Sequence, residues 1–210
     1  VERFSGQLSF SFRYHASARD GWQAADYRPG PDWGPARETG ARPVLVPRPN
    51  RPLVRRPPCP GRLTAQGVFT DPLSPAAPCG ERMQRAALAY RAPGDWGLPE
   101  TPASLPVEKG LRLADPAGDG LYLLVDLQRE EAGLLHLDIA LPEPARILIG
   151  FGEHLDDLRA RTSVGGRQFA AVYEARAGRQ TFTHALKRAG CRYVQLHIYA
   201  HAATLYYAGV

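Results

Sequence analysis

Hydrophobic and polar residues alternate along several short segments of this chain. Apolar residues occupy every second position in residues 135–141 and again in residues 145–151, and residues 191–199 place one apolar face against a polar and aromatic one. Residues 8–14 show the same alternation near the start of the sequence. Strict alternation is typical of a β-strand that buries one face. We therefore predict antiparallel strands in these four segments.

A fifth alternating segment, residues 169–175, leads through Ala177 and Gly178 into a run that contains Phe182. This order predicts a β-hairpin. The connection that precedes it, from Gly150 to Arg167, has roughly sixteen residues, whereas compact domains usually join strands with about two to six. Loops of that length tend to be functional or mobile.

The remaining segments are rich in turn residues. Prolines are too frequent in residues 43–60 for a central strand, because each lacks a backbone donor, so we predict an extended, polyproline-like connector on the surface. Residues 81–91 fit both a short helix and a strand. The other predicted elements are a strand at residues 62–69, loops at 71–80 and 93–106, and turns at 22–33 and 115–120.

Composition favours the same fold class. The chain contains 20 prolines and 21 glycines among 210 residues, which indicates many turns and few long helices. We predict an all-β fold, an antiparallel β-sandwich of jelly-roll, galactose-binding-like or concanavalin-like type with long Pro-rich loops. The expected organisation is a strand and Trp-rich segment (1–40) that ends a preceding β domain, a Pro/Arg-rich connector with strands (41–120) and a β-sandwich module (121–210).

The net charge of +5 comes almost entirely from arginine, since Lys109 and Lys187 are the two lysines. Arginine richness together with alanine and proline is typical of a biased genomic base composition, and attraction to an acidic polymer remains the alternative. No run of eighteen apolar residues occurs, so no membrane partner is expected, and no nucleic acid is expected either. The sequence begins without methionine or a signal peptide, so we expect an internal fragment, cytoplasmic rather than secreted.

Motifs for common chemistries are sparse. Cys59 and Cys79 could bridge a Pro-rich loop in an exported protein, whereas Cys191 is expected to be a small buried hydrophobe. His197 and His201 are four residues apart in a strand-like segment rather than on a zinc-binding helix. The sequence has no Gly-x-Ser-x-Gly elbow and no Gly-rich phosphate loop. No cofactor is predicted.

Three acidic residues, Glu153, Asp156 and Asp157, lie together in the long loop. A solvated acidic loop is the simplest interpretation. A domain interface or a calcium site is the main alternative, although calcium takes six or more oxygen ligands and these three could supply only part of them. Glycoside cleavage by a pair of carboxylates is the least supported interpretation.

Aromatic residues supply the other candidates for carbohydrate or interface contacts. Arg192 beside Tyr193 could hold a sugar or a carboxylate, or Arg192 could pair with a loop acid while Tyr193 lies on the sheet face. Trp22, Trp33 and Trp96 fall in loop-like sequence. Each could stack on a sugar ring, but a core edge or a domain seam is the more common place for tryptophan.

Two sets of short motifs follow one another along the chain. Upstream lie Asp32 to Ala36, Pro43 to Arg48 and Arg62 to Ala65, and within residues 121–199 lie residues 122–127, Gly133, residues 152–153, Tyr173, residues 179–182 and residues 190–194. In this order the second set resembles the β-sandwich module that precedes the catalytic barrel in bacterial α-L-rhamnosidases, and the first set is similar to the Trp-, Pro- and Arg-rich linker of those enzymes.

The resemblance implies a non-catalytic accessory region of an inverting enzyme that releases L-rhamnose. Its partners would be the (α/α)6 catalytic barrel of the same protein and carbohydrate (rhamnosides). Glu153 matches the acidic residue that ends a strand of the family module, where it faces a neighbouring domain or a sugar. In such enzymes the catalytic acids lie in the barrel that follows this module, so we expect residues 1–210 to be inactive alone. The alternatives are a free-standing carbohydrate-binding module, a structural or protein-interaction domain, and a stand-alone hydrolase that uses Glu153.

Overall fold

The computed structural model describes residues 3–5, 9–10, 13–17, 21, 24–40, 44, 46–47, 54, 56–98 and 103–210. The chain divides into two compact units, one formed by Val1–Ser17 with Pro58–Val210 and the other by Ala18–Pro57. The described strands and helices all belong to the first unit. No described helix is long and apolar enough to cross a membrane.

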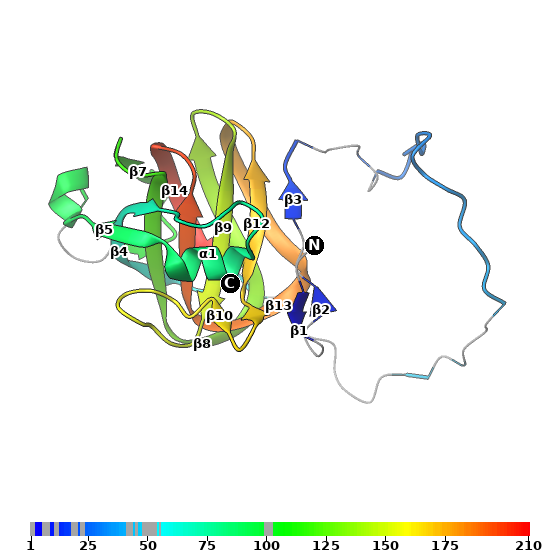
Figure 1. Ribbon diagram of the computed structural model, residues 1–210. Coiled ribbons are helices and arrows are strands. Elements are labelled where there is room, and N and C mark those ends of the chain that lie inside the picture. Colours follow the sequence, from blue (N-terminus) through cyan, green and yellow to red (C-terminus); the bar gives the residue numbers. More distant parts are fainter. Residues whose placement is uncertain are drawn as a thin grey trace. The chain divides into compact units, whose positions relative to one another are not determined.

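Strands dominate this first unit, as the alternating pattern and the turn-rich composition predicted (Figure 1). One α-helix and one short 3-10 helix accompany them. In chain order the elements are β1 (Arg3–Ser5), β2 (Ser9–Phe10), β3 (Arg13–His15), β4 (Gly61–Thr70), α1 (Cys79–Arg85), β5 (Ala87–Tyr90), η1 (Pro93–Trp96), β6 (Ala103–Leu105), β7 (Leu111–Ala114), β8 (Gly120–Leu141), β9 (Ala145–Gly152), β10 (Ser163–Val164), β11 (Arg167–Gln168), β12 (Ala170–Ala175), β13 (Gly178–Ile198) and β14 (Ala202–Gly209).

Two long strands, β8 and β13, organise the sheet. The first half of β8 pairs with β4 and with the second half of β13, whereas its second half pairs with β14 and with the first half of β13. The main order is β3-β12-β9-β13-β8-β14-β7, antiparallel throughout except that β3 runs parallel to β12. One hydrophobic core takes residues from both halves of β8 and from β9, β13 and β14. The sheet therefore folds over on itself, and the predicted all-β fold is confirmed.

The bend in the long strands is fixed by Asp126. Gln128 adopts a left-handed backbone conformation (φ 68°), and the β13 register shifts between Cys191 and Tyr193. The Asp126 carboxylate accepts hydrogen bonds from the Gln128 amide (2.6 Å) and from Arg192 Nε and Nη2 (2.9 and 3.0 Å). One carboxylate thus joins the two irregular positions, and Arg192 pairs with an acid of strand β8 rather than with the loop acid that was expected.

A second core lies on the other face of the sheet, where α1 and the long loop after β9 cover it. Phe69, Tyr122 and Leu124 pack there with Ala86 and Ala160, and beside them Met83 of α1 packs against Leu148 and Val172. Strand β8 is consequently buried on both faces between Leu121 and Val125. A continuous apolar run is the expected sequence of such a strand.

Several predicted elements need correction. The hairpin at Ala177 and Gly178 is wrong, because β12 pairs with β9 and β3 whereas β13 pairs with β8 and β9. The turn instead carries the chain from one half of the folded sheet to the other, and Gln180 holds it by accepting hydrogen bonds from Tyr173 Oη (2.9 Å) and the Arg176 amide (3.0 Å). Alternation shows that a strand has a buried face, but it does not identify the neighbouring strand.

The other predicted elements agree in outline with the structure. The strand expected at 62–69 is β4, and residues 81–91 contain both the end of α1 and all of β5. The predicted loops at 71–80 and 93–106 contain the start of α1, η1 and β6. Of the strand expected at 8–14, residues 9–10 and 13–14 lie in β2 and β3, and the others lie outside the described residues, as does half of the connector at 43–60.

Gly67 lies in β4 where the backbone of the paired strand β5 comes very close. A Cβ atom there would lie 2.3 Å from the Ala89 carbonyl oxygen, a backbone atom of the paired strand β5. We expect Gly67→Ala to lower the free energy of unfolding by about 1 to 3 kcal/mol, because the two strands must separate to admit the methyl group. Urea unfolding measures this. Gly190→Ala in β13 is the matched control, since no atom lies within 4 Å of its Cβ position, and an equal loss in both variants would contradict the explanation.

Candidate functional site

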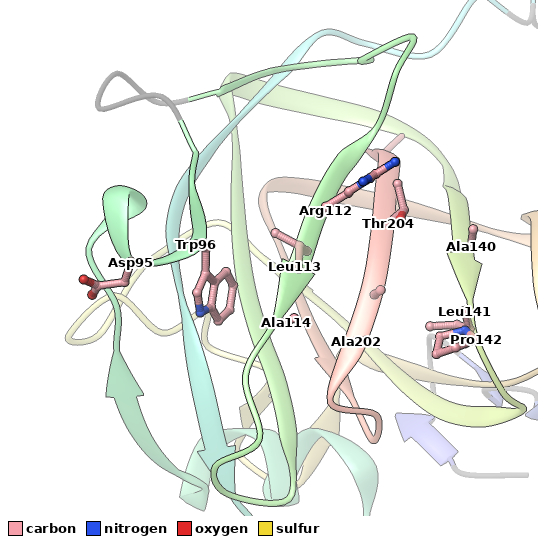
Figure 2. A pocket seen from close by; sticks show the side chains of 11 residues that line it. Asp95, Trp96, Arg112, Leu113, Ala114, Ala140, Leu141, Pro142, Ala202 and Thr204 are labelled. Atoms are coloured by element: carbon pink, nitrogen blue, oxygen red, sulfur yellow. The ribbon is translucent and has the colours of Figure 1, made fainter.

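A groove with a volume of about 630 Å3 lies beside β7, β14 and the end of β8. Figure 2 shows Trp96 on one side of Leu113, with Arg112 and Thr204 together at one end and Leu141 and Pro142 on the far side. Small side chains keep the floor low. The lining residues are Asp95, Trp96, Arg112, Leu113, Ala114, Ala140, Leu141, Pro142, Ala202, Ala203 and Thr204.

Trp96 is held in place by the short 3-10 helix η1 and by a hydrogen bond. The helix begins at Pro93, the Asp95 carboxylate accepts from the Ala92 amide (2.9 Å), and Gly97 with φ 65° ends the turn. The half-buried indole points its Nε1 at the Asp115 carboxylate (3.4 Å). The tryptophan is therefore fixed at its polar edge, while its ring lines the groove.

The negative charge of Asp115, which accepts the hydrogen bond from the Trp96 indole, is balanced by neighbouring groups. Asp115 accepts hydrogen bonds from the Ala117 amide (3.0 Å) and from Arg91 Nε (2.7 Å). The amide and the arginine lower the pKa of Asp115, against the opposing effect of burial. The group is therefore ionised at neutral pH, and its charge is balanced by Arg91 rather than directed into the groove.

Arg112 and Thr204 are paired across β7 and β14, and Thr204 is in turn paired with Ala140 of β8. Cross-strand partners share a face of the sheet, so the guanidinium and the hydroxyl lie side by side. The neighbouring Arg179 is committed elsewhere, because it forms an ion pair with Asp138 (2.8 Å) and covers the Tyr206 ring at 3.6 Å. Arg112 is exposed and forms no ion pair with any acid in the described part of the chain.

The acidic residues predicted as a site lie elsewhere, on the long loop after β9. Glu153, Asp156 and Asp157 are all exposed, and none of them lines the groove. The Asp156 amide closes a tight turn on the Arg159 carbonyl (2.7 Å), and the Asp157 carbonyl accepts from Tyr90 Oη (2.7 Å). A domain-interface or sugar role for these three side chains remains a prediction.

Backbone contacts fix this loop to the sheet and to α1. Arg159 Nη1 donates to the carbonyls of Gln84 (2.7 Å) and Ala86 (2.8 Å), and the Ala160 amide donates to Gln195 Oε1 (2.8 Å). The Tyr122 hydroxyl donates to the Leu158 carbonyl. The unusual length of the loop therefore has a structural use, since it covers the second core.

The remaining predicted site residues are dispersed. Arg192 pairs with Asp126, and its guanidinium lies 5.1 Å from the centre of the Tyr193 ring. Tyr193 packs against the second core. It is the register partner of Gly152, the residue before Glu153. Trp33 belongs to the unit formed by residues 18–57, where it is 51% exposed and contacts Tyr27 at 5.8 Å between ring centroids. Trp22 lies outside the described residues.

Metal and thiol chemistry find little support in the part of the chain that is described. No group of three or more His, Cys, Asp or Glu side chains there is placed to hold a metal ion. Cys59, Cys79 and Cys191 are free thiols, and Cys191 is fully buried, as predicted for a small hydrophobe. The proposed bridge between Cys59 and Cys79 is thus not formed.

A second hollow of about 200 Å3 lies on β4 between Tyr90, Gln66, Arg91 and Leu158. Tyr90 is 39% exposed at its rim. Ligand pockets are usually about 300 to 1,000 Å3, so this hollow is small for a sugar ring and its substituents, whereas the Trp96 groove is of suitable size.

Trp96 packs against the edge of the main core, the place that the sequence analysis favoured for tryptophan, and it lines the groove as well. Arg112 and Thr204 were not predicted. The available signal was the short alternation Leu111, Arg112, Leu113, which exposes one arginine between two core residues. The pairing of Arg112 with Thr204, more than ninety residues later in the chain, could not be inferred from that pattern.

The sequence matches no family model and no curated protein. Similar solved structures include a GH78 family rhamnosidase of Bacillus sp. GL1 (24% identity, TM-score 0.44, covering 50% of this chain and 11% of that one). They also include the α-L-rhamnosidase of Dictyoglomus thermophilum (13%, TM-score 0.33, 45% and 12%) and a Klebsiella oxytoca rhamnosidase with rhamnose bound (12%, TM-score 0.30, 72% and 28%). The solved structures to which this chain is similar are thus rhamnosidases, and the chain spans 11 to 28% of their length.

Proposed function

We propose that this chain is a non-catalytic accessory β-sandwich of an α-L-rhamnosidase-like glycoside hydrolase, which packs against the catalytic barrel and holds carbohydrate near it. The motifs that resemble the rhamnosidase module fall in β8, β9, β12 and β13, the centre of the folded sheet. The proposal rests on the whole set of motifs and their order, because each motif is short.

The observation that carries the non-catalytic part is the chemistry of the groove. Glycoside cleavage uses two carboxylates on either side of the scissile bond. The groove offers one, Asp95, whose side chain points away from the other lining residues in Figure 2 and is engaged by the Ala92 amide. A fixed aromatic ring, a guanidinium and a hydroxyl are instead the equipment of a binding site.

Two assays on the purified chain test the proposal. We expect no release of nitrophenol from p-nitrophenyl α-L-rhamnopyranoside, and saturable heat when L-rhamnose or rhamnosylated oligosaccharides are titrated in a calorimeter. Titration with calcium and then with a chelator shows whether a cation takes part. Turnover that is lost in Glu153→Gln would instead establish a stand-alone hydrolase, and absence of heat at millimolar sugar would reject a rhamnoside-binding role.

A free-standing carbohydrate-binding module is the second candidate, and the Trp96 groove favours it because the groove is complete within this chain. Size-exclusion chromatography with the catalytic barrel of a rhamnosidase separates the two. Co-elution supports the accessory domain, whereas separate elution with intact sugar binding supports the free-standing module.

A further inference from the structure

We propose that the groove beside β7 and β14 is a binding site for an acidic sugar, a hexuronate unit within a polysaccharide. In this site Trp96 stacks on the ring, Arg112 binds the carboxylate and Thr204 hydrogen-bonds a hydroxyl. The inference rests on the proposed carbohydrate role of the domain and adds a ligand class that the rhamnoside hypothesis does not contain.

Trp96 offers an aromatic surface in the groove. An aromatic ring binds the apolar face of a pyranose, and it does so best when it is already immobile, because less conformational entropy is lost on binding. The indole is fixed by η1 and by its hydrogen bond to Asp115, and it lies beside the low floor formed by Ala114 and Ala202. The groove thus presents a rigid, partly apolar platform.

The charges around the groove differ in whether they have partners. Around the groove, Arg91 is paired with Asp115 and Arg179 with Asp138, whereas Arg112 has no acidic partner among the residues that the structure describes. Asp95 is turned outward. Asp95 has no cationic partner among the described residues either, but in Figure 2 it lies on the opposite side of the groove from Arg112. The uncompensated charge beside Thr204 is therefore positive, and a planar guanidinium is suited to bind a carboxylate through two parallel hydrogen bonds.

Thr204 lies beside Arg112 on the neighbouring strand. The two are register partners, so a ligand carboxylate on Arg112 brings the adjacent ring hydroxyl within reach of the Thr204 side chain. A neutral sugar could use the ring platform and the hydroxyl, but it would leave the guanidinium without its best partner. Charge complementarity is what selects an acidic sugar over a neutral one.

Calorimetry of the intact 210-residue chain with an oligogalacturonide tests the proposal, with the fully methyl-esterified oligosaccharide as the neutral twin. We expect the acidic form to bind about tenfold more tightly than the ester, which corresponds to one charge-assisted contact. Trp96→Ala should weaken both forms, whereas Arg112→Gln should remove the difference between them. Arg188→Gln, at another exposed position, should leave both affinities unchanged.

The outcomes are distinguishable. Equal affinity for acid and ester, or an Arg112→Gln variant that keeps the difference, overturns the acidic-sugar site. Equally tight binding of polyglutamate reveals a general anion site and also overturns it. Binding of rhamnosides without binding of the oligogalacturonide rejects this inference but leaves the proposed function standing. Thermal unfolding of each variant confirms that it is folded.

Discussion

Replacing Arg82 by methionine lowers the free energy of unfolding by about 3 to 5 kcal/mol at pH 7, because it leaves a buried carboxylate without its cation. The Arg82 guanidinium is 7% exposed and pairs with the 5% exposed carboxylate of Asp71 at 2.7 Å. It also donates to Tyr199 Oη (2.6 Å), which in turn donates to the same carboxylate (2.6 Å). Methionine fills most of the volume but leaves Asp71 ionised, buried and short of a partner.

Helix α1 supplies its own control for this prediction. Arg85 lies three residues further on, and its pair with Glu81 is exposed, with side chains 67% and 42% accessible. Arg85→Met should cost less than about 1 kcal/mol, as exposed helix pairs usually do. Urea unfolding at pH 7 compares the two variants. Similar losses of unfolding free energy in both would contradict the prediction that the buried pair with Asp71 stabilises the fold more than an exposed pair does.

The pH dependence of the stability of Arg82→Met distinguishes the loss of the buried ion pair from a loss of packing. In the wild-type chain, burial tends to raise the pKa of Asp71, but hydrogen bonds from Tyr199, the Leu73 amide and Arg82 outweigh it and lower the pKa. Without Arg82 two of the effects that lower the pKa of Asp71 are lost, so this pKa rises and the folded variant takes up a proton at a higher pH than the wild type does. The stability deficit of Arg82→Met should therefore narrow toward pH 4, whereas a deficit caused only by lost packing would stay constant.

The success of the sequence analysis was uneven for a physical reason. Alternation of apolar residues predicted β9 and the end of β13, and the structure buries most positions of both strands, on both faces. It did not predict that residues 128–131 continue β8, because the bend at Gln128 exposes them to solvent and interrupts the alternation. Nor did it identify strand partners, which depend on contacts across the whole chain.

The candidate site was harder to predict than the fold. Glu153, Asp156 and Asp157 attracted attention as a cluster in a long loop, yet the loop owes its length to the second core that it covers. The local signal of Arg112 was not specific, since an exposed arginine between two apolar residues is ordinary strand patterning. What makes Arg112 a candidate is the lack of an acidic partner among the described residues and the proximity of Trp96 and Thr204, and both are properties of the folded chain.

Acidification should destabilise the fold through His197 in particular. Burial lowers the pKa of His197 to about 3, a trend that Arg159 and Arg82 reinforce and Asp71 opposes. The ring is 1% exposed and stacks on Phe69 at 4.4 Å, and Gln195 Nε2 lies 2.8 Å from its Nε2. Because Gln195 Oε1 already accepts from the Ala160 amide, its amide nitrogen donates to His197, which must be neutral to accept.

The sign and size of the effect follow from the two pKa values of this histidine. Between about pH 6.5 and pH 3 the unfolded chain binds a proton at His197 that the folded chain excludes, so stability falls by about 1.4 kcal/mol per pH unit, or roughly 3 kcal/mol from pH 6.5 to pH 4. Carboxylates with lowered pKa values, such as Asp71 and Asp126, add to the loss in every variant. His197→Gln should therefore be less stable at pH 7, where the stacked ring is lost, but its stability should decline less steeply below pH 6.5. Urea unfolding of both proteins at half-unit steps from pH 7.5 to pH 4 measures the two slopes, and parallel curves would mean that His197 is protonated in the folded chain.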